Sequence, residues 1–338
     1  MARTAAHDTL ALEPERAGDV PGASSGRGMA HAIAAAPVTV VYIAGYGRSG
    51  TTLLDISLGA AEDVASCGEL ATLARHVWHE GEFCACGETV RDCAQWRDIV
   101  ADWMPGDSDS GLAELARLQR PREAMISPAR WSDRHVPGRS SERFARVTGD
   151  LYRRIAARTG KSIVIDSSKL PGRGLALADM PGIALYVVHM TRDARGVVWS
   201  LRKPHKIDKE AGVQRELRPK PLLYAAARWA LVNRAAEALA QKVGPDRSMR
   251  VRYEDFVADP QGTVRAILTM VRGRPSRDPV LDAQGRVFPG HQMAGSRHRM
   301  APSIRFRADE SWKRDMPARE RRIVTAATRP MLAAYGYI

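Results

Sequence analysis

Apolar residues in this 338-residue chain gather into short runs that alternate with polar and glycine-rich stretches. Unbroken apolar runs at 38–43 and 183–190 are typical of strands that are buried on both faces of a parallel sheet. The segments 51–58 and 222–243 instead repeat their apolar residues at helical spacing. This alternation predicts an α/β fold with a central parallel sheet and helices on both faces.

Less strongly patterned segments complete the expected fold. We expect further strands at 64–69, 162–166 and 249–253, and helices within 70–78, 112–160, 171–182, 260–270 and 317–335. Prolines are expected to interrupt these helices at Pro121, Pro128, Pro137 and Pro330. The polar or loop-rich stretches are 105–111, 203–221 and 272–311.

The beginning of the chain differs from the rest. Residues 1–36 are rich in Ala, Gly, Ser and charged residues, and we expect a mobile N-terminal tail there. Residues 37–338 are expected to form a single domain with helical and loop insertions. Because neither a secretory signal pattern nor a membrane-length apolar stretch is found, we expect a cytoplasmic protein without a transmembrane segment. The sequence indicates no oligomeric state.

A glycine-rich turn joins the first predicted strand to the helix that Thr51 opens. Gly45, Gly47 and Gly50 let the backbone turn sharply and approach a ligand closely. A helix N-terminus at such a turn offers backbone N–H groups to an anion. We therefore expect this loop to bind a phosphate-like group through Gly47, Arg48, Ser49, Gly50, Thr51 and Thr52.

Three kinds of ligand site share such a loop. A Walker-type nucleotide site carries Lys where this chain has Thr51, so a P-loop-type kinase is kept only as the alternative function. The glycines also fit a dinucleotide motif, with Glu69 about 20 residues further on, although that match alone is weak. A 5′-phosphosulfate loop needs a cation in the turn and hydroxyls at the helix start, which Arg48, Ser49 and Thr52 help to supply. An ordinary turn of an α/β sheet is the remaining interpretation.

A second polar pair follows the apolar run at 183–190. Arg192 stands at the expected carboxyl end of that strand, where open α/β sheets bind ligands. Ser200 lies eight residues later, about two helical turns further on. The two side chains are suited to hold one more phosphate, although Arg192 pairing with Asp193 or capping a helix explains the same pattern.

Together these motifs resemble the sulfotransferases that use 3′-phosphoadenosine 5′-phosphosulfate (PAPS). The resemblance rests on RSGTT at 48–52, the R-x7-S pair formed by Arg192 and Ser200, RVRYEDFVADP at 250–260 and AGSRHR at 294–299. It implies a P-loop-like fold and transfer of a sulfuryl group from PAPS to a hydroxyl of a small-molecule acceptor. The implied acceptor is a natural product, sugar or lipid, the product is adenosine 3′,5′-bisphosphate, and no metal is required.

The resemblance also implies roles for single residues. Arg48 would neutralise the leaving phosphate oxygen, Glu69 would act as the base and Lys169 would stabilise the sulfuryl group. Arg297 and Arg299 would close over the 3′-phosphate and adenosine. A helix-terminal position for Glu69, an exposed position for Lys169 and a solvated loop for the two arginines remain alternatives.

The C-terminal loop departs from the family pattern at one place. Relatives often carry Gly-Asn where this chain has Gly295 and Ser296.

The formal charge of +13 does not point to nucleic acid. The basic residues comprise 43 arginines and eight lysines, and they are scattered without a long basic run. An arginine excess together with much Ala and Gly is typical of GC-rich coding, so we expect no nucleic-acid partner.

Three of the four cysteines lie close together in the sequence. Cys84, Cys86 and Cys93 form a C-x-C-x6-C pattern that is not a standard zinc ligand set, whereas His76 or His79 offers a nearby imidazole. In a cytoplasmic chain we expect reduced thiols, with zinc binding and a local disulfide as the alternatives.

Overall fold

The computed structural model describes residues 37–204, 206–208, 216 and 218–338. The expected tail at 1–36 lies outside these residues, as does part of the expected loop at 203–221. The described residues beyond position 36 form one compact unit. Among the described helices, none combines the length and the apolar composition that a membrane span requires.

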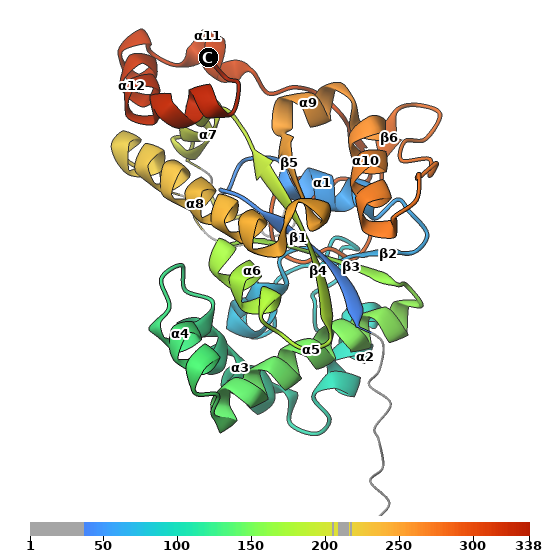
Figure 1. Ribbon diagram of the computed structural model, residues 1–338. Coiled ribbons are helices and arrows are strands. Elements are labelled where there is room, and N and C mark those ends of the chain that lie inside the picture. The colour runs from blue at the N-terminus through green and yellow to red at the C-terminus, as the bar shows by residue number, and fades with distance from the viewer. Residues whose placement is uncertain (1–36, 205, 209–215, 217) are drawn as a thin grey trace, which may run out of the picture. The chain divides into compact units, whose positions relative to one another are not determined.

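Five parallel strands form the central sheet (Figure 1). In chain order they are β1 (Val38–Ala44), β2 (Val64–Ser66), β3 (Ile163–Lys169), β4 (Ile183–Thr191) and β5 (Ser248–Arg252). Their order across the sheet is β2-β3-β1-β4-β5, so β1 lies in the middle and pairs with β3 and β4.

The central strand shows why its apolar run is unbroken. Val40 and Tyr42 pack into one layer of helices, whereas Val41 and Ile43 pack into the opposite layer, and all four side chains are fully buried. Because side chains of a strand alternate between the two faces, a strand that is covered on both faces needs apolar residues at successive positions.

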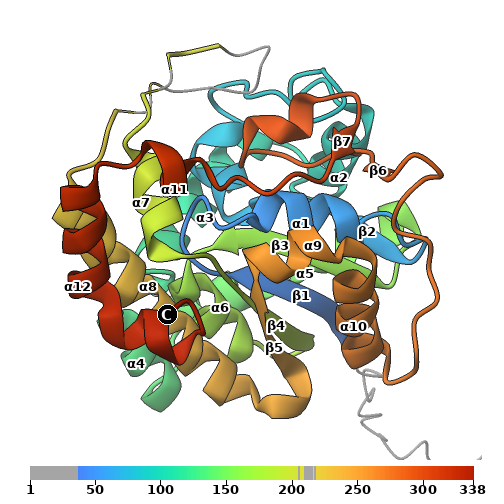
Figure 2. The same ribbon diagram turned by 90° about the horizontal axis from the view of Figure 1, so that it is seen from above.

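Helices cover both faces of the sheet (Figures 1 and 2). One face packs against α5 (Arg139–Thr159), α6 (Pro171–Ala178) and α8 (Leu222–Val243), and the other packs against α1 (Thr51–Leu58) and α10 (Pro260–Arg272). A third apolar cluster joins α8 to α7 (Ala194–Leu201), α11 (Ser311–Asp315) and α12 (Ala318–Ala334). The α/β fold with a parallel sheet and a P-loop-like turn is thus confirmed.

The remaining described elements surround this frame. They are α2 (Ala94–Trp103), α3 (Ser108–Arg122), α4 (Pro128–His135), α9 (Tyr253–Ala258), β6 (Arg286–Val287) and β7 (Ile304–Arg305). Single helical turns lie at Leu70–Thr72, Leu73–Val77, Pro245–Arg247 and Arg297–Met300. The turn at 297–300 carries two of the expected cofactor-binding arginines.

Two local predictions are wrong. The expected loop at 105–111 ends early, because Asp107 accepts a hydrogen bond from the Ser110 N–H (3.1 Å) and so caps α3. Helix α12 continues through Pro330 instead of being interrupted there. Met331, the next residue, is buried in the cluster with α7 and α8, and this packing offsets the backbone hydrogen bond that proline cannot make.

Candidate functional site

The glycine loop between β1 and α1 has a backbone that only glycine fits at two positions. Gly50 caps α1 with a φ of 89°, and a Cβ built on it would lie 2.7 Å from the Tyr253 ring. A Cβ on Gly45 would lie 2.3 Å from the Met190 carbonyl oxygen. A Cβ on Gly47 would meet no atom within 4 Å, so the loop is open to a ligand at that residue.

The polar side chains of this loop are buried at the start of α1. Ser49 is 1% exposed, and its hydroxyl has no hydrogen-bond partner among the described residues. Thr52 Oγ1 accepts a hydrogen bond from the Ser296 N–H (3.1 Å), which ties the C-terminal loop to the helix start. Because a buried hydroxyl without a partner is costly, the Ser49 hydroxyl fits a bound anion in the loop.

Three arginines lie close enough to repel one another at this loop. Burial lowers the pKa of the Arg48 guanidinium, and the charges of Arg192 and Arg297 lower it further. Arg192 donates a hydrogen bond to the Arg48 carbonyl oxygen (3.0 Å) and stacks on the Tyr253 ring at 4.5 Å. Its other nitrogen pairs with Asp309 Oδ2 at 3.1 Å. This cluster of cations, with one nearby carboxylate, is suited to bind a polyanion.

Two other residues expected to bind the cofactor lie in different surroundings. Ser200 is half-buried in the last turn of α7, and its role stays a prediction. Arg299 is fully buried, and it donates to the carbonyl oxygens of Ser296 (3.4 Å) and Phe83 (3.3 Å). Arg299 therefore holds two loops together, and a contact to the cofactor stays a prediction for it as well.

Glu69 and Lys169 form an ion pair at the carboxyl ends of the neighbouring strands β2 and β3. Strand β3 continues beyond its expected end at Asp166 and ends at Lys169, which has a positive φ of 70°. A Cβ on Gly295 would lie 2.8 Å from Thr52 Oγ1 and 3.2 Å from Glu69 Oε1. The carboxylate thus lies beside the start of α1, so the structure brings this expected catalytic pair to the glycine loop.

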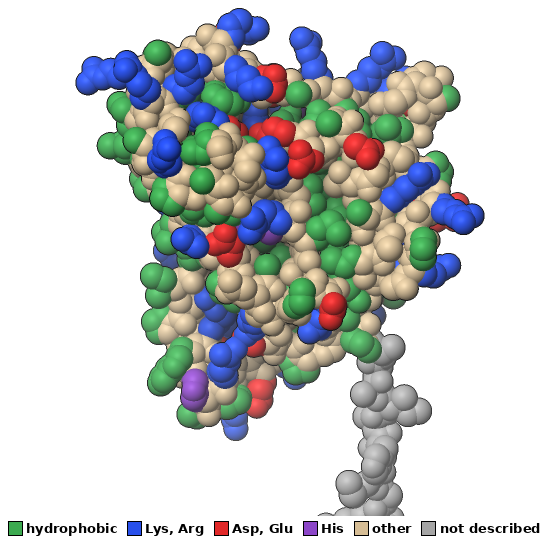
Figure 3. Space-filling model, turned by 45° about the horizontal axis from the view of Figure 1, so that its top comes forward, with side chains coloured by type: hydrophobic (Ala, Val, Ile, Leu, Met, Phe, Trp, Pro, Cys, Tyr) green, Lys and Arg blue, Asp and Glu red, His purple; other side chains and the backbone are tan. Residues whose placement is uncertain are grey.

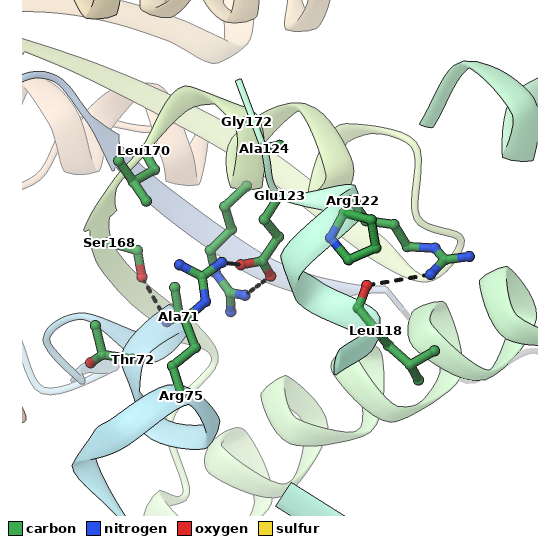
Figure 4. A network of polar contacts seen from close by, with 12 residues as sticks. Ala71, Thr72, Arg75, Leu118, Arg122, Glu123, Ala124, Ser168, Leu170 and Gly172 are labelled. Atoms are coloured by element: carbon green, nitrogen blue, oxygen red, sulfur yellow. Dashed lines mark hydrogen bonds and ion pairs between the residues drawn. The ribbon is translucent and has the colours of Figure 1, made fainter. Parts of the chain in front are cut away.

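A second, more deeply buried network of charged residues includes Glu123, which Figure 4 shows beside Arg75. Arg173 is fully buried and pairs with Asp166 (2.8 Å) and with Glu123, which also pairs with Arg75 (2.6 Å). Asp166 further accepts hydrogen bonds from the backbone N–H (3.0 Å) and the hydroxyl of Ser168. Asp166 therefore caps the turn that leads to Lys169.

Sequence reasoning missed Asp55, which lies in the apolar helix α1. Burial raises the pKa of this carboxyl to about 7, against hydrogen bonds from Ser66, Ser167 and the Gly68 N–H (2.9 Å) that lower it. Asp55 thereby fixes the turn that precedes Glu69. A single acid among the apolar residues of 53–58 was the signal for it.

Tyr253 and Asp309 were also missed as site residues. Tyr253 opens α9 in the YED segment, and its ring lies between Gly50 and Arg192.

His189 in β4 is a buried core residue whose ring has a hydrogen-bond partner, as its position within the strand indicates. It pairs with Asn233 Oδ1 (2.9 Å), and burial lowers its pKa to about 4.

A pocket of about 610 Å³ opens next to Lys169. Its charged and apolar lining includes Arg75, Arg117, Arg120, Glu123, Leu170 and Arg228. Leu170, the residue that follows Lys169 in the chain, is part of this lining. Much of the lining comes from residues 70–140.

The surface charge has no single focus on the face shown in Figure 3. Lys and Arg side chains lie at several separate places there, with Asp and Glu side chains between them. This distribution agrees with the scattered basic residues of the sequence.

One segment of the chain matches the model of a known protein family. Residues 183–273 match the model of the Sulfotransferase family, and this segment contains Arg192, Ser200 and the YED motif. This part of the chain is thus similar to sulfotransferases, in agreement with the resemblance that its motifs carry. No curated protein matched the sequence.

Several solved sulfotransferase structures show a partial likeness. The sulfotransferase domain of the Synechococcus PCC 7002 olefin synthase is 21% identical, with 73% of this chain and 77% of that one covered and a TM-score of 0.42. The domain from the curacin biosynthetic pathway is 18% identical, with 86% and 96% covered and a TM-score of 0.46. STF9 from Mycobacterium avium is 14% identical, with 88% and 77% covered and a TM-score of 0.45.

Proposed function

We propose that this protein transfers a sulfuryl group from PAPS to a hydroxyl group of a small-molecule acceptor. The observation that carries the proposal is the convergence of Arg48, Arg192 and Arg297 on a glycine loop whose buried Ser49 hydroxyl has no partner among the described residues. Like charges held this close call for an anionic ligand that neutralises them.

The donor would be held at both ends. The residues from Gly47 to Thr52 would bind the 5′-phosphosulfate with N–H groups, hydroxyls and the Arg48 guanidinium. Arg192, Ser200 and Arg297 would bind the 3′-phosphate, with Arg299 bracing the loop over it. PAPS would supply the sulfuryl group and leave as adenosine 3′,5′-bisphosphate. Since guanidinium and N–H groups supply the positive field, the transfer would require no metal ion.

Different residues would carry out the separate parts of the reaction. Arg48 would neutralise the negative charge that develops on the leaving phosphate oxygen. The N–H groups of Thr51 and Thr52 would stabilise the same oxygen by hydrogen bonds. Glu69 would accept the proton of the acceptor hydroxyl, oriented for this by its ion pair with Lys169. Lys169 would also stabilise the negative sulfuryl oxygens during transfer.

The pocket beside Lys169 suggests the chemical class of the acceptor. Arg75, Arg117, Arg120 and Arg228 line it with one acid, Glu123. A hydroxyl compound that carries a negative group, such as an acidic sugar, lipid headgroup or natural product, would complement this lining. In this proposal the protein acts in the cytoplasm and has no nucleic-acid partner.

Binding of adenosine 3′,5′-bisphosphate without metal tests the donor site. A ligand at a hundredfold excess over its dissociation constant stabilises a protein by about 2.7 kcal/mol, so we expect a clear rise in melting temperature. Arg192→Ala should abolish the rise, because it removes the cation that links the glycine loop to α7. Arg97→Ala is the matched control, since Arg97 is exposed on α2 and pairs only with its neighbour Asp98.

The alternatives give different results in the same assay. A clear shift with ADP and Mg²⁺, without any shift with the bisphosphate, would overturn the proposal in favour of a P-loop-type kinase. A shift with NAD alone would favour the dinucleotide interpretation, and one with an oligonucleotide alone would favour nucleic-acid binding.

A further inference from the structure

Four potential metal ligands from two distant parts of the chain lie together, away from the glycine loop. They are the thiols of Cys84, Cys86 and Cys93 and the imidazole of His291, and their ligand atoms all lie within 4.8 Å of one another. His291 follows Cys93 by 198 residues, so the fold alone brings the histidine to the cysteines.

The distances within this cluster suit one tetrahedral ion. Cys93 Sγ lies 3.3 Å from His291 Nδ1, and Cys84 Sγ lies 3.8 Å from the same nitrogen. Zinc bonds of about 2.3 Å to sulfur and about 2.0 Å to nitrogen place the two ligand atoms about 3.5 Å apart in a tetrahedron. The two observed distances bracket this value.

The backbone around the cluster is held in place by its own hydrogen bonds. The Cys84 N–H donates to Glu88 O (2.8 Å), and the Cys93 N–H donates to Thr89 O (2.8 Å). The Trp96 indole N–H donates to the His291 carbonyl oxygen (2.7 Å). The ligands are therefore oriented by contacts that do not involve a metal.

The histidines that are close in sequence are used elsewhere. His76 pairs with Glu82 at 2.7 Å, and His79 lies 4.0 Å from Asp109. Among the described residues, neither of these histidines therefore joins the cysteine cluster. The unusual C-x-C-x6-C spacing gains its fourth ligand from His291 instead.

We propose that Cys84, Cys86, Cys93 and His291 bind one structural Zn²⁺ ion. Each thiol gives its proton to solvent when it binds the ion, and neutral His291 binds through Nδ1. Four protein ligands close the tetrahedron, which is the arrangement of structural and not of catalytic zinc. The ion therefore takes no part in the proposed sulfuryl transfer.

The ion would fasten the C-terminal loop to the candidate active site. Next to His291, the Gln292 carbonyl accepts from the Ala85 N–H (3.0 Å), and Met293 exchanges backbone hydrogen bonds with Cys67 (3.0 Å) and Glu69 (3.1 Å). Three residues further, Ser296 donates to Thr52. A metal that fixes His291 would thus position the loop that packs on Glu69 and on the start of α1.

Metal analysis of the full chain tests this proposal. We expect about one zinc per chain after purification under reducing conditions, retained through dialysis against a weak chelator. Cys84→Ser and His291→Ala should each lose most of the zinc, whereas Cys67→Ser should keep it, because Cys67 is buried outside the cluster. Co²⁺ exchanged into the wild-type protein should show thiolate-to-metal absorption.

Two results would overturn the proposal without relying on any variant. One is a wild-type chain that contains no zinc, retains none when it is added, and shows four titratable thiols. The other is a disulfide among the three cysteines, detected as two missing thiols in the non-reduced protein. If zinc is present, its removal with a strong chelator should lower the melting temperature.

Discussion

Two groups of arginines, one around the fully buried Arg173 and one around the partly buried Arg48, lie in surroundings of opposite charge. Burial by itself would lower the pKa of Arg173, but Glu123, Tyr152 and Asp166 together raise it well above its usual value. Burial also lowers the pKa of Arg48, and there the nearest charges, Arg192 and Arg297, lower it further. The first group is surrounded mainly by carboxylates, whereas in the second the arginines repel one another and Asp309 offsets that repulsion only in part.

This difference distinguishes a structural role from a binding role. A buried guanidinium between carboxylates already has its counter-ions, so a ligand gains little there. A guanidinium facing other cations gains attraction and loses repulsion when a polyanion binds. Amino-acid composition cannot distinguish the two cases, because both groups consist of arginines.

The largest expected effect tests the first group. Arg173→Ala should lower the free energy of unfolding by about 3–5 kcal/mol, because it leaves Asp166 buried without its cation and leaves Glu123 with Arg75 alone. Urea denaturation measures it. Arg153→Ala is the control and should cost less than about 1 kcal/mol, since its pair with Asp150 is exposed.

A double variant sharpens that test. The double variant Arg173→Ala, Glu123→Gln should lose less free energy of unfolding than the two single variants together. One of the two carboxylates that face Arg173 is then already neutral. Additive losses would show that packing of the long side chain, and not its charge, accounts for the stability.

The next largest effect tests the second group. Arg48→Ala should slow release of adenosine 3′,5′-bisphosphate from PAPS by about 10²–10³-fold, the usual consequence of removing one donor to a developing negative charge. Its effect on stability should be much smaller than that of Arg173→Ala, since Arg48 is only partly buried and its removal relieves repulsion from Arg192 and Arg297. Arg48→Lys should recover part of the rate. If Arg48→Ala lowered the free energy of unfolding as much as Arg173→Ala does, the distinction between the two groups would be contradicted.

The sequence predicted the frame of the fold because burial on both faces leaves a readable pattern. The strands beginning at Val38 and Ile183 and the helix at 222–243 were all found from apolar residues alone. The errors lie where one local contact or distant packing decides, as at the Asp107 cap and at Pro330. Neither the cap nor the packing around Pro330 changes the spacing of apolar residues in the sequence.

The candidate site was readable only where it follows a contiguous motif. The glycine loop and Arg192 stand at strand ends, and the structure brings them together as expected. The partnership of Arg173 with Glu123 spans 50 residues, and that of His291 with Cys93 spans 198. Such pairs depend on how helices and loops pack, so one sequence cannot assign them.

The smallest expected effect concerns the one carboxylate that partly balances the second group. Asp309 pairs with Arg192 through a side chain that is 46% exposed. Asp309→Asn keeps acceptors for the Ser311 hydroxyl and N–H but removes the charge that competes with a bound phosphate. Because exposed ion pairs contribute about 0.2–1 kcal/mol, affinity for the bisphosphate should rise at most about fivefold, measured by calorimetry.

Asp315→Asn is the matched control for this small gain, because Asp315 is on the neighbouring helix α11 and pairs with exposed Arg314. It should change the affinity less than Asp309→Asn does, because Asp315 pairs with Arg314 and Asp309 pairs with Arg192. If Asp309→Asn weakens binding instead, Asp309 holds Arg192 in its binding orientation. The second group would then resemble the first in carrying its own counter-ion, and its need for an anion would be smaller than the arginine cluster implies.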